Sequence, residues 1–304
     1  MRTQDLTMGF IGCGRVGRTL ARALANAGYR VSAAWSRDPS ALQRFAGEVP
    51  GAKPCHAAQQ VIDRCDFIWI TVADDAIEPV VQSLRWSPRH RVVHCSGATG
   101  LAALRKARHD GAQTGGFHPL QMFANPEVAL RGLPGCTVGI AAADGGFAAE
   151  LGEIATRLGC VPFQVPEGSR ALYHASAYYV GPFLIALLRE ASLLWKSFGG
   201  TEQQTLDALL PLLAGTVAAV KDAGLAKGMG GCVARGDVGT VAKHLDALHD
   251  LSTDAQALYR DLALRTVPMG LERGTLSRDG AARIHSVLCE APASRKAHRV
   301  KAYL

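Results

Sequence analysis

A glycine-rich turn near the start of the chain constrains its fold most. Residues 8–17 read MGFIGCGRVG, an apolar run followed by the spacing Gly-x-Gly-x-x-Gly at Gly12, Gly14 and Gly17. The residues that follow repeat apolar side chains at helical spacing and end at Gly28. In such a strand–turn–helix, the first glycine permits the tight turn, the second lets backbone approach a pyrophosphate, and the third lets helix and strand pack closely. The sequence therefore predicts a dinucleotide-binding fold.

The helix that follows the turn is expected to hold the phosphates. Its N-terminus offers free N–H groups and a partial positive charge. Arg15 and Val16 occupy the first helical turn. We therefore count both among the cofactor-binding residues, with the three glycines.

The end of the second expected strand, residues 29–35, indicates which dinucleotide binds. An NAD-binding protein places a carboxylate here for the ribose 2′-hydroxyl, whereas this chain has Ser36 and Arg37. Asp38 precedes Pro39 and a helical run, the pattern of a helix N-cap. Arg37 can donate a charge-assisted hydrogen bond to a 2′-phosphate, so we predict NADP(H). A solvated surface role for Arg37 is the alternative.

The length of 304 residues suits two domains. Hydrophobic residues make up 48% of the chain and charged residues 19%, as in soluble globular proteins. Eight cysteines are scattered without Cys-x-x-Cys spacing, and the N-terminus shows no signal-peptide pattern. We therefore expect a cytoplasmic protein with reduced thiols and no metal site. The apolar stretch 178–195 contains Arg189 and Glu190, which favours a buried helix over a membrane span.

The net charge of +7 owes four charges to the C-terminal tail, at Arg295, Lys296, Arg299 and Lys301. Basic tails are usually solvated chain ends. No basic stretch is interleaved with aromatic residues, so we expect an anionic cofactor and no nucleic acid.

Strand and helix patterns alternate in the first half of the chain. The apolar runs predict strands at 66–72, 91–95, 115–119, 136–142 and 160–165, with helices at 40–46, 74–84, 101–108 and 146–158. After residue 167 only helical patterns appear, at 171–195, 201–213, 215–223, 237–248 and 253–265. This order predicts an α/β fold: a doubly wound parallel Rossmann sheet with extra strands at one edge, in residues 1–166, then an all-helical domain in 167–304.

Ligands of such sheets bind beyond the carboxyl ends of the strands. The residues expected there are Val72, Ala73 and Asp74 after one strand, Ser96 and Gly97 after the next, and His118 at the end of a third. We expect helix capping for at least one of Asp74 and Asp75, and a turn role is the alternative for Ser96 and for His118. Ser96 and His118 are our catalytic candidates in this domain.

The helical domain adds four candidates. His174 lies near the start of its first helix and is the third catalytic candidate. Arg235, Thr240 and His244 surround a helix start at Asp237 and suit an anionic or carbonyl-bearing substrate. The alternative is an Arg235–Asp237 ion pair with His244 packed in the core.

These motifs together resemble those of one group of bacterial two-domain proteins. They are residues 9–17, 71–77, 94–97, 117–121 and 235–237, with Thr240 and His244. The group pairs a Rossmann domain with a helical domain of unknown function, and is similar to pyrroline-5-carboxylate reductase and more distantly to 6-phosphogluconate and β-hydroxyacid dehydrogenases. The resemblance implies an NADP-dependent oxidoreductase fold whose helical domain forms a homodimer.

One departure from the distant relatives bears on the chemistry. The β-hydroxyacid dehydrogenases carry a catalytic Lys on the first helix of the second domain, and the matching stretch 174–178 has none. We therefore expect an NADP(H)-dependent reductase of a small imine or oxo compound, with its site between the domains. A non-catalytic NADP(H)-binding regulator is the alternative, and a prephenate-type dehydrogenase is a weaker one.

Overall fold

The computed structural model describes residues 6–290 and divides into two compact units, one ending at Pro182 and the other beginning at Phe183. The basic tail lies outside the described residues. The division falls after the first helix that follows the sheet, whereas the sequence predicts a boundary before that helix. This helix, α8 (Arg170–Val180), therefore belongs with the sheet.

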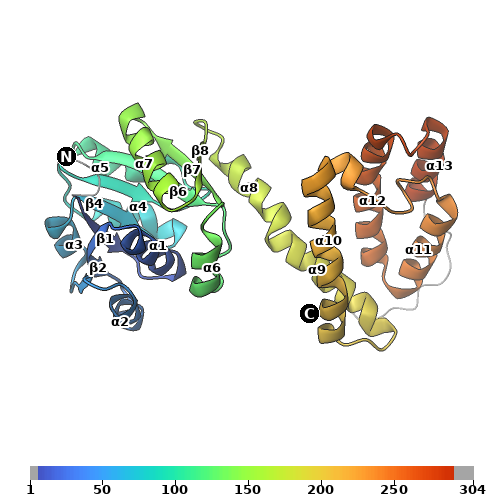
Figure 1. Cartoon of the computed structure of the whole chain (residues 1–304), viewed down its shortest axis with the longest axis horizontal. Coiled ribbons are helices and arrows are strands. Elements are labelled where there is room, and N and C mark those ends of the chain that lie inside the picture. The colour runs from blue at the N-terminus through green and yellow to red at the C-terminus, as the bar shows by residue number, and fades with distance from the viewer. Residues whose placement is uncertain (1–5, 291–304) are drawn as a thin grey trace. The chain divides into compact units, whose positions relative to one another are not determined.

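The first unit is built on an eight-stranded sheet in the order β3-β2-β1-β4-β5-β6-β7-β8 (Figure 1). Its strands are β1 Thr7–Ile11, β2 Arg30–Trp35, β3 Lys53–Pro54, β4 Phe67–Ile70, β5 Arg91–His94, β6 Gln113–Pro119, β7 Thr137–Ala142 and β8 Val161–Gln164. Strands β1 to β6 pair in parallel, β7 pairs antiparallel to β6, and β8 pairs in parallel with β7. The predicted doubly wound sheet with extra edge strands is confirmed.

Helices cover both faces of this sheet. They are α1 Arg15–Asn26, α2 Pro39–Glu48, α3 Ala58–Arg64, α4 Asp74–Gln82, the 3₁₀ turn η2 Leu101–Leu104, α5 Arg105–His109, α6 Pro126–Gly132 and α7 Gly145–Arg157. Because strand side chains alternate, Phe67 and Trp69 pack on the face of α1 and α7, while Ile68 and Ile70 pack on the face of α3, α4 and α5. These two apolar clusters, one on each face, hold the sheet in place. The carboxyl ends of its parallel strands carry the candidate residues.

The second unit is helical throughout its described part. It contains α9 Pro182–Ser197, α10 Glu202–Gly228, α11 Val238–Leu251, α12 Thr253–Arg273 and α13 Arg278–Cys289. Its core is formed mainly by α11, α12 and α13, with Val241, Leu245, Val267 and Ile284 among the buried side chains.

Two predictions about helices in the C-terminal half are wrong, and one helix was missed. The helix expected at 171–195 is interrupted at Gly181, whose backbone is non-helical, because Pro182 follows it. The two helices expected at 201–213 and 215–223 are one, α10, which kinks at Gly224. Helix α13 was not expected.

The prediction that the stretch 178–195 is buried is also wrong for the single chain. Ser192 is the one buried residue of α9, and Phe183 and Ile185 are exposed. The stretches 170–197 and Glu202–Gly228 have the length and apolar composition of membrane spans, which is weak evidence by itself because helices of soluble proteins meet the same criterion.

Candidate functional site

The turn between β1 and α1 is locked against the end of β4. Gly12 has φ of +103°, and a Cβ there would lie 2.6 Å from the backbone of Thr71. The Thr71 hydroxyl donates a hydrogen bond of 2.6 Å to the backbone oxygen of Gly12. A Cβ at Gly17 would lie 2.5 Å from that same oxygen. Two of the three glycines therefore serve close packing, as the motif predicts.

The third glycine faces open space. A Cβ at Gly14 would meet no atom of residues 6–290 within 4 Å, and Gly14 and Arg15 are exposed. Helix α1 begins at Arg15 with no side-chain cap, so its first N–H groups are free of side-chain acceptors. An exposed, uncapped helix start behind a bare glycine fits the pyrophosphate of a dinucleotide. Val16, in the same turn, is half-buried.

At the end of β2, Ser36 is half-buried and Arg37 is exposed. The Asp38 carboxylate accepts a hydrogen bond of 2.8 Å from the backbone N–H of Ser40, so the predicted N-cap of α2 is confirmed. Since Asp38 is engaged in the cap, Ser36 and Arg37 remain the side chains for a ribose 2′-substituent.

The capping role expected for Asp74 or Asp75 is wrong. Helix α4 begins at Asp74 with Ala73 at its N-cap, and no side chain caps it. The Asp74 carboxylate instead accepts a hydrogen bond of 2.7 Å from the Ser96 hydroxyl. The ends of β4 and β5 are thereby joined, next to exposed Ala73 and half-buried Val72.

Ser96 stabilises the turn that follows β5 and also donates the hydrogen bond to Asp74. Its hydroxyl oxygen accepts a hydrogen bond of 2.9 Å from the backbone N–H of Thr99 and lies 2.8 Å from the Thr99 hydroxyl. Because its own proton is directed to Asp74, Ser96 holds the loop that carries Gly97. Ser96 and Gly97 are both buried.

His118 and His174 converge on Gly97. A Cβ at Gly97 would lie 2.2 Å from Nδ1 of His174 and 2.8 Å from Nε2 of His118. The two imidazole rings meet edge to face with their centroids 5.3 Å apart. The structure therefore brings together all three catalytic candidates, Ser96, His118 and His174, at the carboxyl edge of the sheet.

The electrostatic setting keeps His118 neutral. Burial, followed by the neighbouring His174 and Arg170, lowers the pKa of His118 to about 4. The imidazole of His94, fully buried at the end of β5, has its pKa lowered to about 3 by burial and then by Arg170 and His118. Desolvation and nearby positive charge both disfavour imidazolium.

Helix α8 contributes two further residues: Arg170, which the sequence analysis did not select, and Tyr173, which directly precedes His174. With His174 they lie at positions i, i+3 and i+4, so they share one helix face. Each rests against a glycine: a Cβ at Gly116 would lie 2.9 Å from Nη1 of Arg170, and a Cβ at Gly139 would lie 2.5 Å from the Tyr173 hydroxyl. The helical spacing around His174 was the signal that could have identified them.

The candidates of the second unit form a separate group. The predicted N-cap at Asp237 is confirmed, because its carboxylate accepts hydrogen bonds from the backbone N–H and the hydroxyl of Thr240. His244 is exposed, with Nδ1 at 2.9 Å from the Tyr259 hydroxyl, so the expected core packing of His244 is wrong. Arg235 is exposed, and no ion pair joins it to Asp237 in residues 6–290. A substrate role for Arg235, Thr240 and His244 stays a prediction.

No group of three or more His, Cys, Asp or Glu side chains within the described part of the chain is placed to hold a metal ion.

A search of the curated proteins found no match. Residues 7–97 match the family model described as NADP oxidoreductase, coenzyme F420-dependent, and residues 136–266 match a domain of unknown function, DUF2520. The predicted NADP(H) cofactor is the one named by the first of these families.

Solved structures share the fold over most of the chain. A candidate NADP oxidoreductase from Bacteroides fragilis is 22% identical, with a TM-score of 0.69 over 88% of this chain and 99% of that one. An imine reductase from Pseudomonas sp. is 21% identical, with a TM-score of 0.61 over 87% and 95%. The pyrroline carboxylate reductase of Plasmodium falciparum, solved with NADP bound, is 13% identical, with a TM-score of 0.58 over 93% and 99%.

The predicted resemblance is confirmed by these matches. The chain is similar to the NADP oxidoreductase family over residues 7–97 and to DUF2520 over residues 136–266, and it shares the fold of these solved structures.

Proposed function

We propose that the protein is an NADP(H)-dependent reductase of a small imine or oxo compound. The observation that carries this proposal is the meeting of Ser96, His118 and His174 at the carboxyl edge of the sheet. Strand β4 links that edge to the dinucleotide turn, because Thr71 packs against Gly12 and Asp74 holds Ser96. The bound cofactor supplies the hydride, and the protein orients the reactants and provides for one proton.

The two substrate types make different demands on that proton. A protonated imine already carries its proton and needs no strong acid. An oxo compound needs a proton donor, for which His174 is the candidate because His118 is held neutral. We also propose that the protein is cytoplasmic, as the scattered cysteines lead us to expect.

NADPH oxidation with a panel of cyclic imines and 2-oxo acids tests the proposal. We expect turnover with at least one class, and loss of turnover in His118→Ala with NADPH binding intact. NADPH binding without turnover on the whole panel would favour a non-catalytic regulator. Unchanged turnover in His118→Ala would remove His118 from the mechanism.

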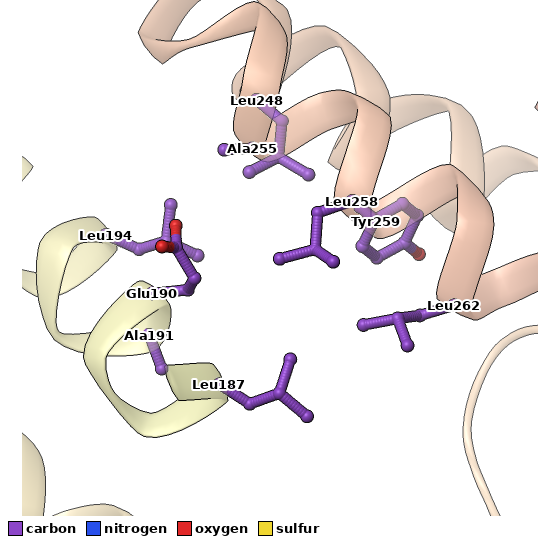
Figure 2. Close-up of a pocket in the computed structure, with 9 residues that line it drawn as sticks. All are labelled: Leu187, Glu190, Ala191, Leu194, Leu248, Ala255, Leu258, Tyr259 and Leu262. Atoms are coloured by element: carbon purple, nitrogen blue, oxygen red, sulfur yellow. The ribbon is translucent and has the colours of Figure 1, made fainter. Parts of the chain in front are cut away.

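We also propose that the second unit forms a homodimer through α9 and α10. No Leu, Ile, Val, Phe or Met side chain of these helices is buried in the single chain. A groove of about 190 Å³ separates α9 from α11 and α12, and Figure 2 shows that its walls are almost entirely apolar, with Glu190 the one charged side chain. Exposed apolar helices beside an apolar groove fit a second copy of the same surface.

Light scattering after size-exclusion chromatography tests this assembly. We expect a dimer for the wild type and a monomer for the double variant Ile185→Glu/Leu212→Glu. The control Val161→Glu changes an exposed apolar residue of β8 and should leave the dimer intact. A wild-type chain that is monomeric, or that is recovered only from membranes, would contradict the proposal.

A further inference from the structure

The hydroxyl of Tyr173 contacts two polar atoms of His118. It donates a hydrogen bond of 3.1 Å to the backbone oxygen of His118, and it lies 3.3 Å from Nδ1 of the same residue. His118 and Gly139 are paired across β6 and β7.

These contacts assign the proton on the His118 ring. A tyrosine hydroxyl has one proton to donate and two lone pairs to accept with. Since its proton goes to the backbone oxygen of His118, the hydroxyl turns a lone pair to Nδ1. Two facing lone pairs would repel, so Nδ1 must carry a proton and donate it to Tyr173. In a neutral imidazole the other nitrogen, Nε2, is then an acceptor.

We propose that Tyr173 is a positioning residue that holds His118 in the Nδ1–H tautomer, so that Nε2 is presented to the substrate as a hydrogen-bond acceptor. This inference rests on the reductase function proposed above. It goes further because it names Nε2 as the atom of His118 that contacts the substrate. It also predicts that the substrate group at this atom is a hydrogen-bond donor.

The surroundings of the two rings support this role. They meet edge to face, with centroids 5.6 Å apart and an interplanar angle of 83°. Burial raises the pKa of Tyr173 to about 12, so its hydroxyl stays protonated. On the opposite side of the His118 ring, Nε2 lies beside Gly97 and has no hydrogen-bond partner among residues 6–290.

An acceptor at Nε2 selects among the two substrate types. A protonated imine presents an N–H group and can donate to Nε2. A carbonyl oxygen presents lone pairs, which would face the lone pair of Nε2 without a proton between them. The tautomer therefore favours a substrate with an N–H at the reacting centre.

Tyr173→Phe tests the proposal, because it removes the hydroxyl and keeps the ring. Tyr29→Phe is the matched control: Tyr29 is a buried tyrosine just before β2, at the opposite edge of the sheet. The tautomer is measured from ¹⁵N chemical shifts of histidine-labelled protein, with the His118 signals identified by their loss in His118→Gln. Turnover is measured with a cyclic imine and with the ketone of the same ring size.

We expect Nδ1–H in the wild type and in Tyr29→Phe, and a mixture of tautomers in Tyr173→Phe. Loss of one hydrogen bond should lower kcat/KM for the imine roughly tenfold in Tyr173→Phe, with the affinity for NADPH unchanged. A proton on Nε2 of His118 in the wild type would overturn the proposal. The same tautomer population of His118 and the same turnover in Tyr173→Phe and Tyr29→Phe would also overturn it.

The two readouts separate this inference from the function on which it rests. The ¹⁵N measurement needs neither cofactor nor substrate. If no compound is turned over by the wild type, the reductase function fails and the substrate preference fails with it, whereas the chemical shifts still decide whether Tyr173 sets the tautomer.

Discussion

Nη2 of Arg170 donates a hydrogen bond to the backbone oxygen of Ser96, which ties the first turn of α8 to the end of β5. Nε and Nη1 of the same guanidinium have no partner within the described chain, although the side chain is only 6% exposed. A buried positive charge therefore lies close to His94 and His118, and it acts to lower the pKa of each.

Replacing Arg170 by methionine should raise the pKa of His118 from about 4 toward the ordinary value, because the imidazolium form then no longer faces the guanidinium. The pKa is measured by NMR titration of the histidine ring. Arg105→Met, which removes an exposed guanidinium paired with Glu78, is the control and should leave it in place. A pKa of His118 that is equal in the two variants would show that burial and His174 suffice.

Gly97→Ala should abolish turnover while the protein still folds. The added methyl group would overlap Nδ1 of His174 and crowd Nε2 of His118, so both rings must move. A displacement of about 1 Å at a reacting group costs on the order of 100-fold in rate. Gly100→Ala is the control in steady-state kinetics, because a Cβ at Gly100 meets nothing within 4 Å. Equal rates in the two alanine variants would place the reaction elsewhere.

Arg37→Ala should weaken NADPH binding about 10- to 100-fold and leave NADH binding nearly unchanged, since only NADPH has a 2′-phosphate for the guanidinium. Isothermal titration calorimetry with both coenzymes measures the difference. Arg30→Ala, at the start of β2 and also exposed, is the control. Equal losses for NADPH and NADH in Arg37→Ala would mean that Arg37 does not recognise the 2′-phosphate.

The first unit should lose stability as the pH falls below neutral. The pKa of His94 is about 3 in the folded chain and near 6.5 when unfolded, so the unfolded chain binds more protons between these values. Stability from this residue is therefore complete above about pH 6.5 and declines toward pH 3. At pH 5 the loss is about 2 kcal/mol, or roughly 4–8 °C in Tm.

Thermal unfolding followed at pH 7 and at pH 5 checks this expectation. His94→Asn should show a smaller difference in Tm between the two pH values than the wild type. His56→Asn, which alters an exposed histidine, should match the wild type. A wild-type Tm that does not change between the two pH values would contradict the assignment of a buried neutral His94.

Local sequence signals predicted the features that depend on local geometry. The roles of Gly12 and Gly17, the caps at Asp38 and Asp237, and the alternation of strands and helices in the first unit follow from spacing and side-chain type. Asp74 shows the limit of such signals. Acidic residues at a helix start usually suggest capping, but here the carboxylate is taken by Ser96 from the neighbouring strand.

The glycines against which α8 packs could not be predicted in this way. Gly116 and Gly139 are ordinary strand glycines in the sequence, and their use becomes visible only when Arg170 and Tyr173 are placed against them. The continuity of α10 and the whole of α13 were missed for a related reason. Gly215 indicates a break that α10 does not make, and the polar start of α13 at Arg278 hides its apolar face, which packs in the core of the second unit.

Three side chains of α8 pack against three glycines, Gly116 within β6, Gly139 within β7 and Gly97 after β5, and this arrangement has a consequence for engineering. Arg170, Tyr173 and His174 share one rigid scaffold, so tilting that helix shifts all of them at once. A new substrate specificity is therefore easier to obtain by exchanging the helix together with the glycines that it contacts than by replacing one of the three side chains.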